Sequence, residues 1–217
     1  MRLHSFRSIG LLTVFPAMGF LLTLMACHRS FNSHDYFPLK AGYRWHYRGA
    51  IGTVAIEEAA ATQTKEFIAV YADSSGKVLW KERYVKTPQN IHWIALEPQA
   101  PVATSYQFDK GIPIGLFSDH AGARLDFETV ERSSKKDVRT IKVAYQIIGR
   151  ESVTVPAGTY PDAIKMTMTI RYSDDVEGAR ISQNIYWFAA KVGIVKFSWD
   201  NEVAELLSAE LDQRLSS

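Results

Sequence analysis

Side chains able to carry out acid–base or nucleophilic catalysis occur in this 217-residue chain, but their spacing does not favour it. Ser, Asp and His follow one another at residues 118–120, and neighbours on a turn seldom reach the hydrogen-bond geometry of a catalytic triad. No Gly-x-Ser-x-Gly elbow is present to support a hydrolase. The adjacent acids at 57–58 and 174–175 would face opposite sides of a strand, so neither forms an acid–base pair. We therefore expect no enzyme activity and assign no catalytic residue.

Histidine and cysteine are also badly placed for a metal site. No two histidines have the spacing of the His-Glu-x-x-His motif, and no cysteine lies near them in the body of the chain. A metal site would have to be assembled from distant strands, so we expect no metal and no other cofactor. The histidines in question are His28, His34, His46, His92 and His120.

Cys27 is the only cysteine, and it ends an apolar run. Arg2 and Arg7 precede an uncharged stretch from residue 9 to residue 26, which is the order of a secretory signal: a positive start, a hydrophobic middle and a small residue at the end. About 18 apolar residues are also just enough for a helix that spans a bilayer. A retained membrane helix and an unmodified thiol are therefore alternatives to a cleaved signal.

The residues before Cys27 resemble the lipobox of bacterial lipoprotein precursors, in which an aliphatic, a variable and a small residue precede the cysteine. Leu24, Met25 and Ala26 occupy those positions, Met25 being larger than usual. The resemblance implies that the Cys27 thiol receives a diacylglyceryl group, that cleavage follows Ala26, and that the new N-terminus is acylated. Several acyl chains hold a protein firmly at a membrane, whereas a single chain holds it marginally.

This interpretation divides the chain into a signal peptide at 1–26, a lipidated cysteine with a short tether at 27–36, and a single β domain at 37–217. The acyl chains on Cys27 would anchor that domain in the bacterial cell envelope. His28, rather than an aspartate, follows the cysteine, which resembles lipoproteins sorted to the outer membrane. We therefore expect an outer-membrane anchor with the domain on the periplasmic face.

The charge of the exported part argues against a nucleic-acid partner. Removing residues 1–26 takes away Arg2 and Arg7 of the 25 basic residues and no acid, so 23 basic residues balance 23 acidic ones. A nucleic-acid-binding domain usually has a basic face and a high pI. Without a second cysteine the domain has no internal disulfide, and a hydrophobic core must stabilise it.

Alternation of apolar and polar residues dominates the domain and predicts strands with one dry and one wet face. It is clearest at 141–147, where Ile141, Val143, Tyr145 and Ile147 share one side, and at 164–172, which begins with Ile164 and ends with Tyr172. We expect nine or ten strands and a mainly β fold: a single curved antiparallel sheet or open half-barrel with little helix. Looser alternation occurs at 43–47, 67–71, 78–85, 90–96, 125–130, 181–188 and 194–199.

Two stretches depart from this pattern. Residues 98–122 contain several prolines and glycines and are expected to be the longest irregular region, of the kind that often forms a lid or binding loop. Residues 202–215 fit a helix, with Val203, Leu207 and Leu211 on one side, and a final strand through 203–211 fits nearly as well. The sequence leaves this second choice open.

Three segments together resemble a group of uncharacterised bacterial lipoproteins, the TapB-like family. They are "YFPLKAGYRWHYR" (36–48), "VTVPAGTYPDAIKM" (153–166) and "YWFAAKVGIVKFSW" (186–199). Lys191 departs from the family pattern, in which glycine often occupies that turn. The resemblance implies a fold related to the LolA and LolB lipoprotein carriers, a curved sheet half-closed around a lipid-accepting cavity, and it carries no catalytic residue. From the residues alone, Gly42 and Gly158 are expected at turn positions with positive φ.

Aromatic and methionine side chains allow two interpretations. They fill a core, or they line a wall of the curved sheet that accepts a lipid, lipoprotein acyl chains or another hydrophobic ligand. The alternative function, which goes with a filled core, is an interaction module that docks on another envelope protein through a sheet edge or the 98–122 region. The candidate ligand-binding residues are Trp80, Tyr84, Trp93, Tyr145, Met166 and Met168.

Overall fold

The computed structural model describes residues 31–59, 65–88, 90–99, 101, 104–114, 117–173, 180–199 and 202–211. Cys27, the predicted signal peptide and the acids at 174–175 lie outside the described residues. The part from Phe31 to Ser217 forms one compact unit. Within the described residues, no helix is long and apolar enough to cross a membrane.

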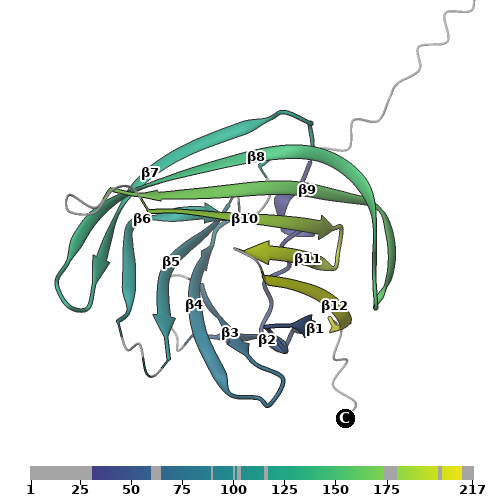
Figure 1. Cartoon of the computed structure of the whole chain (residues 1–217), viewed down its shortest axis with the longest axis horizontal. Coiled ribbons are helices and arrows are strands. Elements are labelled where there is room, and N and C mark those ends of the chain that lie inside the picture. Colours follow the sequence, from purple (N-terminus) through teal and green to yellow (C-terminus); the bar gives the residue numbers. More distant parts are fainter. Residues whose placement is uncertain are drawn as a thin grey trace, which may run out of the picture. The chain divides into compact units, whose positions relative to one another are not determined.

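Twelve antiparallel strands of the described residues form a closed barrel (Figure 1). Each strand pairs with its neighbours in the chain, and β1 also pairs with β12, which closes the ring. The strands are β1 (Arg44–Gly49), β2 (Thr53–Glu58), β3 (Glu66–Ala72), β4 (Val78–Lys86), β5 (Ile91–Pro98), β6 (Tyr106–Ile114), β7 (Arg124–Ser133), β8 (Val138–Val155), β9 (Gly158–Tyr172), β10 (Arg180–Ala189), β11 (Gly193–Trp199) and β12 (Glu202–Glu210).

The expectation of an open curved sheet or half-barrel is therefore wrong. The segment that the sequence left open between helix and strand is β12, and its register joins Arg44 to Glu210 and Trp45 to Ala209. With β12 in place, β1 has a strand on each side, β2 being the other. Closure removes the exposed edges that an open sheet would leave at its first and last strands.

The region expected to be the longest loop, residues 98–122, contains strand β6. Two features of β6 hide it from pattern analysis. Gly111 has a φ of 64°, where an added Cβ would lie 3.1 Å from the Cβ of His92, and Pro113 has no backbone N–H to give to the ladder. The ladder with β5 shifts register between Trp93 and Ala95. Such irregularities interrupt alternation without ending a strand.

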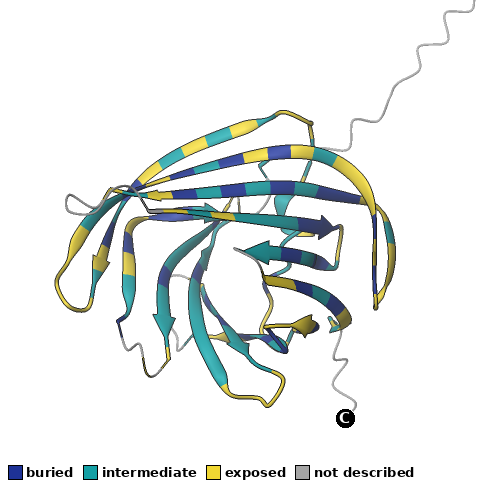
Figure 2. Ribbon diagram, viewed as in Figure 1, coloured by how far each residue is buried: buried dark blue, intermediate teal, exposed yellow. Residues whose placement is uncertain are grey.

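The alternation that predicted the two long strands is confirmed. Ile141, Val143, Tyr145 and Ile147 of β8 are each 1% exposed or less, while the residues between them face outward. Figure 2 shows buried bands alternating with exposed or intermediate bands along β8 and with intermediate bands along most of β9. The buried side chains form two clusters, one beneath β8 and β9 and one formed mainly by β1–β4 and β10–β12.

The residues before β1 lie against one end of the barrel. A 3-10 helix, η1 (Ser33–Asp35), is capped by Asn32, whose side chain accepts a hydrogen bond from the His34 N–H. The Lys191 N–H donates to the Asp35 carbonyl, and Lys191 has a φ of 65°, a conformation that glycine adopts more readily. The expected positive φ at Gly42 and Gly158 is confirmed. Part of the segment predicted to be a tether is thus in contact with the barrel.

Candidate functional site

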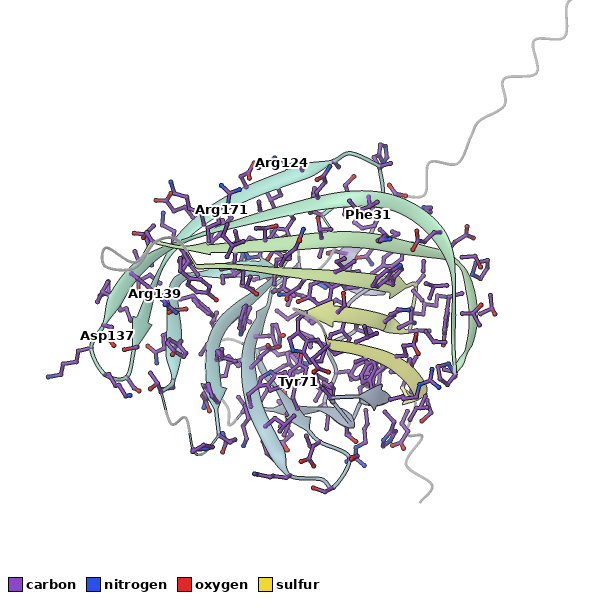
Figure 3. The ribbon with its side chains drawn as sticks, viewed as in Figure 1. Phe31, Tyr71, Arg124, Asp137, Arg139 and Arg171 are labelled. Carbon is purple, nitrogen blue, oxygen red and sulfur yellow. The ribbon has the colours of Figure 1, made fainter. Side chains whose placement is uncertain are left out.

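A cavity of about 420 Å³ lies inside the barrel. That volume is within the range of roughly 300–1,000 Å³ that is typical of small-molecule sites. Its wall is formed by side chains from the inner faces of many strands, most of them aromatic or aliphatic. Figure 3 labels Tyr71, one of these wall residues, among the side chains inside the ring.

Chain before β1 seals one end of the cavity. Phe37, Pro38 and Leu39 all contribute to its lining, and Leu39 is buried. The Phe37 ring lies 5.5 Å from the Tyr84 ring, measured between centroids. The Trp45 indole N–H donates to the Val192 carbonyl at 2.7 Å, which ties β1 to the turn between β10 and β11 at this end.

The opposite end of the cavity is less covered. Its lining comes from the ends of strands that meet there, and most of these side chains are half-buried. Aromatic rings stack at this end: Tyr71 on Trp80 at 4.7 Å and Phe197 on Trp199 at 5.1 Å between centroids. We infer that a ligand would enter here. The half-buried lining residues include Leu79, Trp80, Pro98, Tyr172, Ser182 and Trp199.

All six residues predicted to bind a ligand line this cavity: Trp80, Tyr84, Trp93, Tyr145, Met166 and Met168. The barrel brings them together because each points inward from its strand: two from β4, one from β5, one from β8 and two from β9. That they contact a ligand stays a prediction. The lipidation site, Cys27, lies outside the described residues.

The polar atoms of two of these residues already have partners. The Trp93 indole donates to the Ala95 carbonyl at 2.8 Å, and the Tyr145 hydroxyl donates to the Pro113 carbonyl at 2.6 Å. Both residues therefore present their apolar ring surface to the cavity, with their hydrogen-bonding capacity used by the wall. Met166 and Met168 belong to the cluster beneath β8 and β9 as well, so they connect the packed core to the cavity.

Glu82 is the cavity residue that pattern analysis missed. It lies on β4 between Trp80 and Tyr84, and it is the one charged side chain among the described residues that line the cavity. The sequence signal was present in "WKERY" (80–84), because period-two alternation puts the first, third and fifth residues on the same face. The second and fourth, Lys81 and Arg83, face outward, and Arg83 Nε pairs with Glu97 Oε1 at 2.6 Å.

Aromatic side chains surround the Glu82 carboxyl group. The Tyr84 hydroxyl donates a hydrogen bond to its Oε2 atom, and the Tyr71 hydroxyl and the Trp80 indole are close enough to favour its charged form. Loss of solvation outweighs these donors, so the pKa of Glu82 is raised above its ordinary value of 4.5. Glu82 keeps some accessible surface because it faces the cavity.

The tyrosines near Glu82 are held neutral by burial. Desolvation raises the pKa of Tyr71 and Tyr84 well above 10, and the Glu82 charge adds to the shift of both. The pKa of Tyr186, on β10, is raised for the same two reasons. Their hydroxyls therefore act as hydrogen-bond donors and supply no charge of their own.

The residues weighed earlier for catalysis lie elsewhere. His120 Nδ1 contacts Asp119 Oδ1 at 2.8 Å, and Arg150 pairs with the other oxygen of Asp119 at 2.7 Å. The Ser118 hydroxyl accepts a hydrogen bond from the backbone N–H of His120, not from its ring. His120 has an 86% exposed side chain, so this cluster forms a surface turn. In the described part of the chain, no three His, Cys, Asp or Glu residues gather as metal ligands.

Two solved structures share this fold. The first is described as a "putative exported protein with YmcC-like fold" from Bacteroides fragilis NCTC 9343, with a TM-score of 0.52 and 16% sequence identity. The second is described as a "putative lipoprotein" from Parabacteroides distasonis ATCC 8503, with a TM-score of 0.51 and 16% identity. Each match covers 81% of this chain and 99% of the other chain.

These similarities show the fold and leave the family open. No protein-family model matches the chain, and no curated protein matches it by sequence. The two structures agree with the sequence-based expectation of a fold found among exported proteins and lipoproteins. The TapB-like grouping is finer than they support.

Proposed function

We propose that this protein is a non-catalytic lipoprotein of the bacterial cell envelope that binds a hydrophobic ligand inside its barrel. The observation that carries the proposal is the cavity of about 420 Å³, closed at one end and lined mainly by apolar side chains. A filled core would have placed aromatic and methionine side chains in contact across that space. The six residues singled out from the sequence instead line the cavity from two parts of the barrel, β4–β5 and β8–β9.

The cellular part of the proposal rests on the sequence around Cys27. Acylation there, a TapB-like grouping and an outer-membrane anchor facing the periplasm are consistent with each other. Of the two structures of the same fold, one is described as a "putative exported protein" and the other as a "putative lipoprotein". Labelled fatty acid should enter the wild-type chain and be absent from the Cys27→Ser variant. Equal labelling of both would remove the anchor from the proposal.

Photo-crosslinking tests the cavity directly. The full chain, held in phosphatidylcholine nanodiscs, is irradiated with a fatty alcohol that carries a diazirine at its terminal carbon, and modified peptides are identified by mass spectrometry. We expect labels on inward-facing residues such as Met168 and Ile170. Labels confined to outward-facing residues would contradict ligand binding in the barrel.

Two neighbouring residues on β10 provide a matched pair of variants for this experiment. Ser182 lines the cavity, whereas Gln183, next in the chain, is exposed on the outer face. Ser182→Trp should reduce labelling of the inner wall at least tenfold because the indole occupies the less covered end. Gln183→Trp should leave labelling unchanged. Equal effects of the two variants would show that labelling does not depend on the cavity.

One observation favours docking on an envelope protein as a second candidate function. Among the described residues, the β6–β7 ladder joins Tyr106–Phe108 to Glu131–Ser133, while residues 124–130 of β7 pair with β8 alone. Backbone groups on that side of β7 resemble an edge to which an extended segment of another protein could add. A chain that takes up no alcohol probe in the crosslinking experiment would favour this candidate.

A further inference from the structure

Glu82 is an unusual charge to find on the inner face of the barrel, where it is half-buried. The ion pairs found among the described residues do not include it, although Glu97, on the outer face of the neighbouring strand, is paired with Arg83. The groups that surround Glu82 are aromatic: Tyr84 on its own strand, Tyr71 on β3 and Trp80. A buried carboxylate without a cation is costly, and protein cores rarely retain one.

The rest of the described cavity lining also lacks a positive charge that could pair with Glu82. Among the described residues, the cavity wall contains no lysine, arginine or histidine, so the single charge it offers is negative. A ligand with a carboxylate or phosphate group would meet no cation there and would be repelled by Glu82. An ammonium group would instead meet the Glu82 carboxylate, whose charged form already accepts hydrogen bonds from the neighbouring aromatic side chains. Charge complementarity therefore distinguishes among the hydrophobic ligands that the volume alone would admit.

The aromatic rings favour the same ligand. Tyr71 and Trp80 are stacked with their centroids 4.7 Å apart, and Tyr84 lies on the other side of Glu82 along β4. The faces of such rings attract cations, and the attraction is larger when the cation has lost its water. Aromatic rings beside a carboxylate therefore suit an amine in apolar surroundings.

We propose that the ligand is an amphipathic amine, whose ammonium group lies against Glu82 and whose apolar body extends along the wall toward Met168 and Ile170. This inference rests on the proposed function and narrows it. Simple fatty acids and acidic phospholipids are excluded as preferred ligands, and so is any headgroup that would bring a phosphate next to Glu82.

Thermal unfolding followed by tryptophan fluorescence measures the preference, because a ligand that binds the folded barrel raises its Tm. The full chain in phosphatidylcholine nanodiscs is titrated at pH 8 with decylamine, 1-decanol and decanoate, which share one chain and differ in charge. We expect decylamine to bind at least tenfold more tightly than 1-decanol and decanoate to bind most weakly. Methylamine should have no effect, because charge without an apolar body leaves the cavity unfilled.

Two variants of the same chemistry separate the inner carboxylate from the outer one. Glu82→Gln should lower the decylamine affinity to that of 1-decanol. Glu97→Gln removes a carboxylate from the outer face of the neighbouring strand and should change neither the decylamine affinity nor the 1-decanol affinity. Retention of the amine preference in Glu82→Gln, or binding of decanoate as tight as that of decylamine, would overturn the inference while leaving ligand binding intact.

The pH dependence of the wild-type chain gives a test that needs no variant. Glu82 must be ionised to pair with the amine, and the titratable groups that face it, Tyr71, Tyr84 and Tyr186, stay neutral throughout this range. Decylamine affinity should fall as the pH is lowered toward 4.5, while 1-decanol affinity stays constant. A flat profile for decylamine would contradict a role for Glu82. If none of the three probes raises the Tm, the proposed function itself fails.

Discussion

The inner face of the barrel is tightly packed in one region and hollow in another. Beneath β8 and β9, a packed region of Ile141, Val143, Ile147 and Ile164 has at most 1% of each side chain exposed. Along β4 and β5, a cavity region that includes Trp80 and Leu96 is half-buried. The same period-two alternation underlies both. Alternation therefore identifies the inner face, and the surroundings decide whether that face is filled.

Chain segments outside the strands explain why one region is packed and the other is hollow. Phe31, Tyr36 and Phe117 pack against the cluster beneath β8 and β9, so the space there is filled from several directions. The wall at Leu96 and Trp80 faces the cavity. Interior packing in proteins is normally dense, so a region left hollow beside a packed one is where the proposed ligand would fit.

The largest expected effect comes from truncating one residue of each region. Ile147→Ala removes packed side-chain volume and should lower the free energy of unfolding by about 2–5 kcal/mol. Leu96→Ala enlarges a space that already exists and should cost about 1 kcal/mol, since less contact is lost. Urea unfolding of both variants measures the difference. Equal costs would mean that the cavity region is packed in solution, and the comparison would fail.

A smaller effect should appear in the pH dependence of stability at Glu82. Because its pKa is raised in the folded state, the folded chain holds a proton that the unfolded chain releases, and stability falls as the pH rises above 4.5. Glu82→Gln has no carboxyl group to ionise, so this loss of stability is absent. The free energy of unfolding of the variant, relative to that of the wild type, should therefore increase as the pH rises above 4.5. Urea unfolding of both chains between pH 4 and 8 measures the difference, in which unrelated titrations cancel. A difference that does not change with pH would contradict burial of the carboxyl group.

The smallest effect is expected on the outer face above the packed region. Arg124 pairs with Asp126 at 2.9 Å, but their side chains are 64% and 63% exposed, and Figure 3 shows Arg124 on the outer side of β7. Exposed pairs contribute little to stability because water already solvates both charges. Arg124→Ala should therefore leave the Tm unchanged. A clear decrease in the Tm of Arg124→Ala would show that this ion pair on the outer face also stabilises the packed region.

Sequence reasoning identified most of the strands, because a wet face and a dry face leave a clear alternation. It failed for β6, where Gly111 and Pro113 interrupt the pattern, and for β2, whose short alternation was overlooked. Closure of the barrel could not be predicted, because the residues at 203–211 satisfy the helical and the strand periodicities almost equally. Pairing with β1, which lies far away in sequence, decides between them.

The candidate site was predicted in its apolar part and missed in its polar part. Large aromatic and methionine side chains marked the wall residues, and all six line the cavity. Glu82 was overlooked because charged residues in a strand are normally assigned to the solvent face. Its position between Trp80 and Tyr84 carried the necessary information, since residues two apart share a face.

The pairing of β1 with β12 constrains the order in which the barrel folds. A chain made from its N-terminus presents β1 first and β12 last among the described strands, so the ladder from Arg44 to Glu210 cannot form until β12 has been made. Contacts between residues so distant in sequence also form slowly, because a long loop must close first. The ring of strands around the cavity therefore closes only when β12 pairs with β1. Until then β1 lacks its second neighbour, and the strands already made can form only an open sheet with exposed edges.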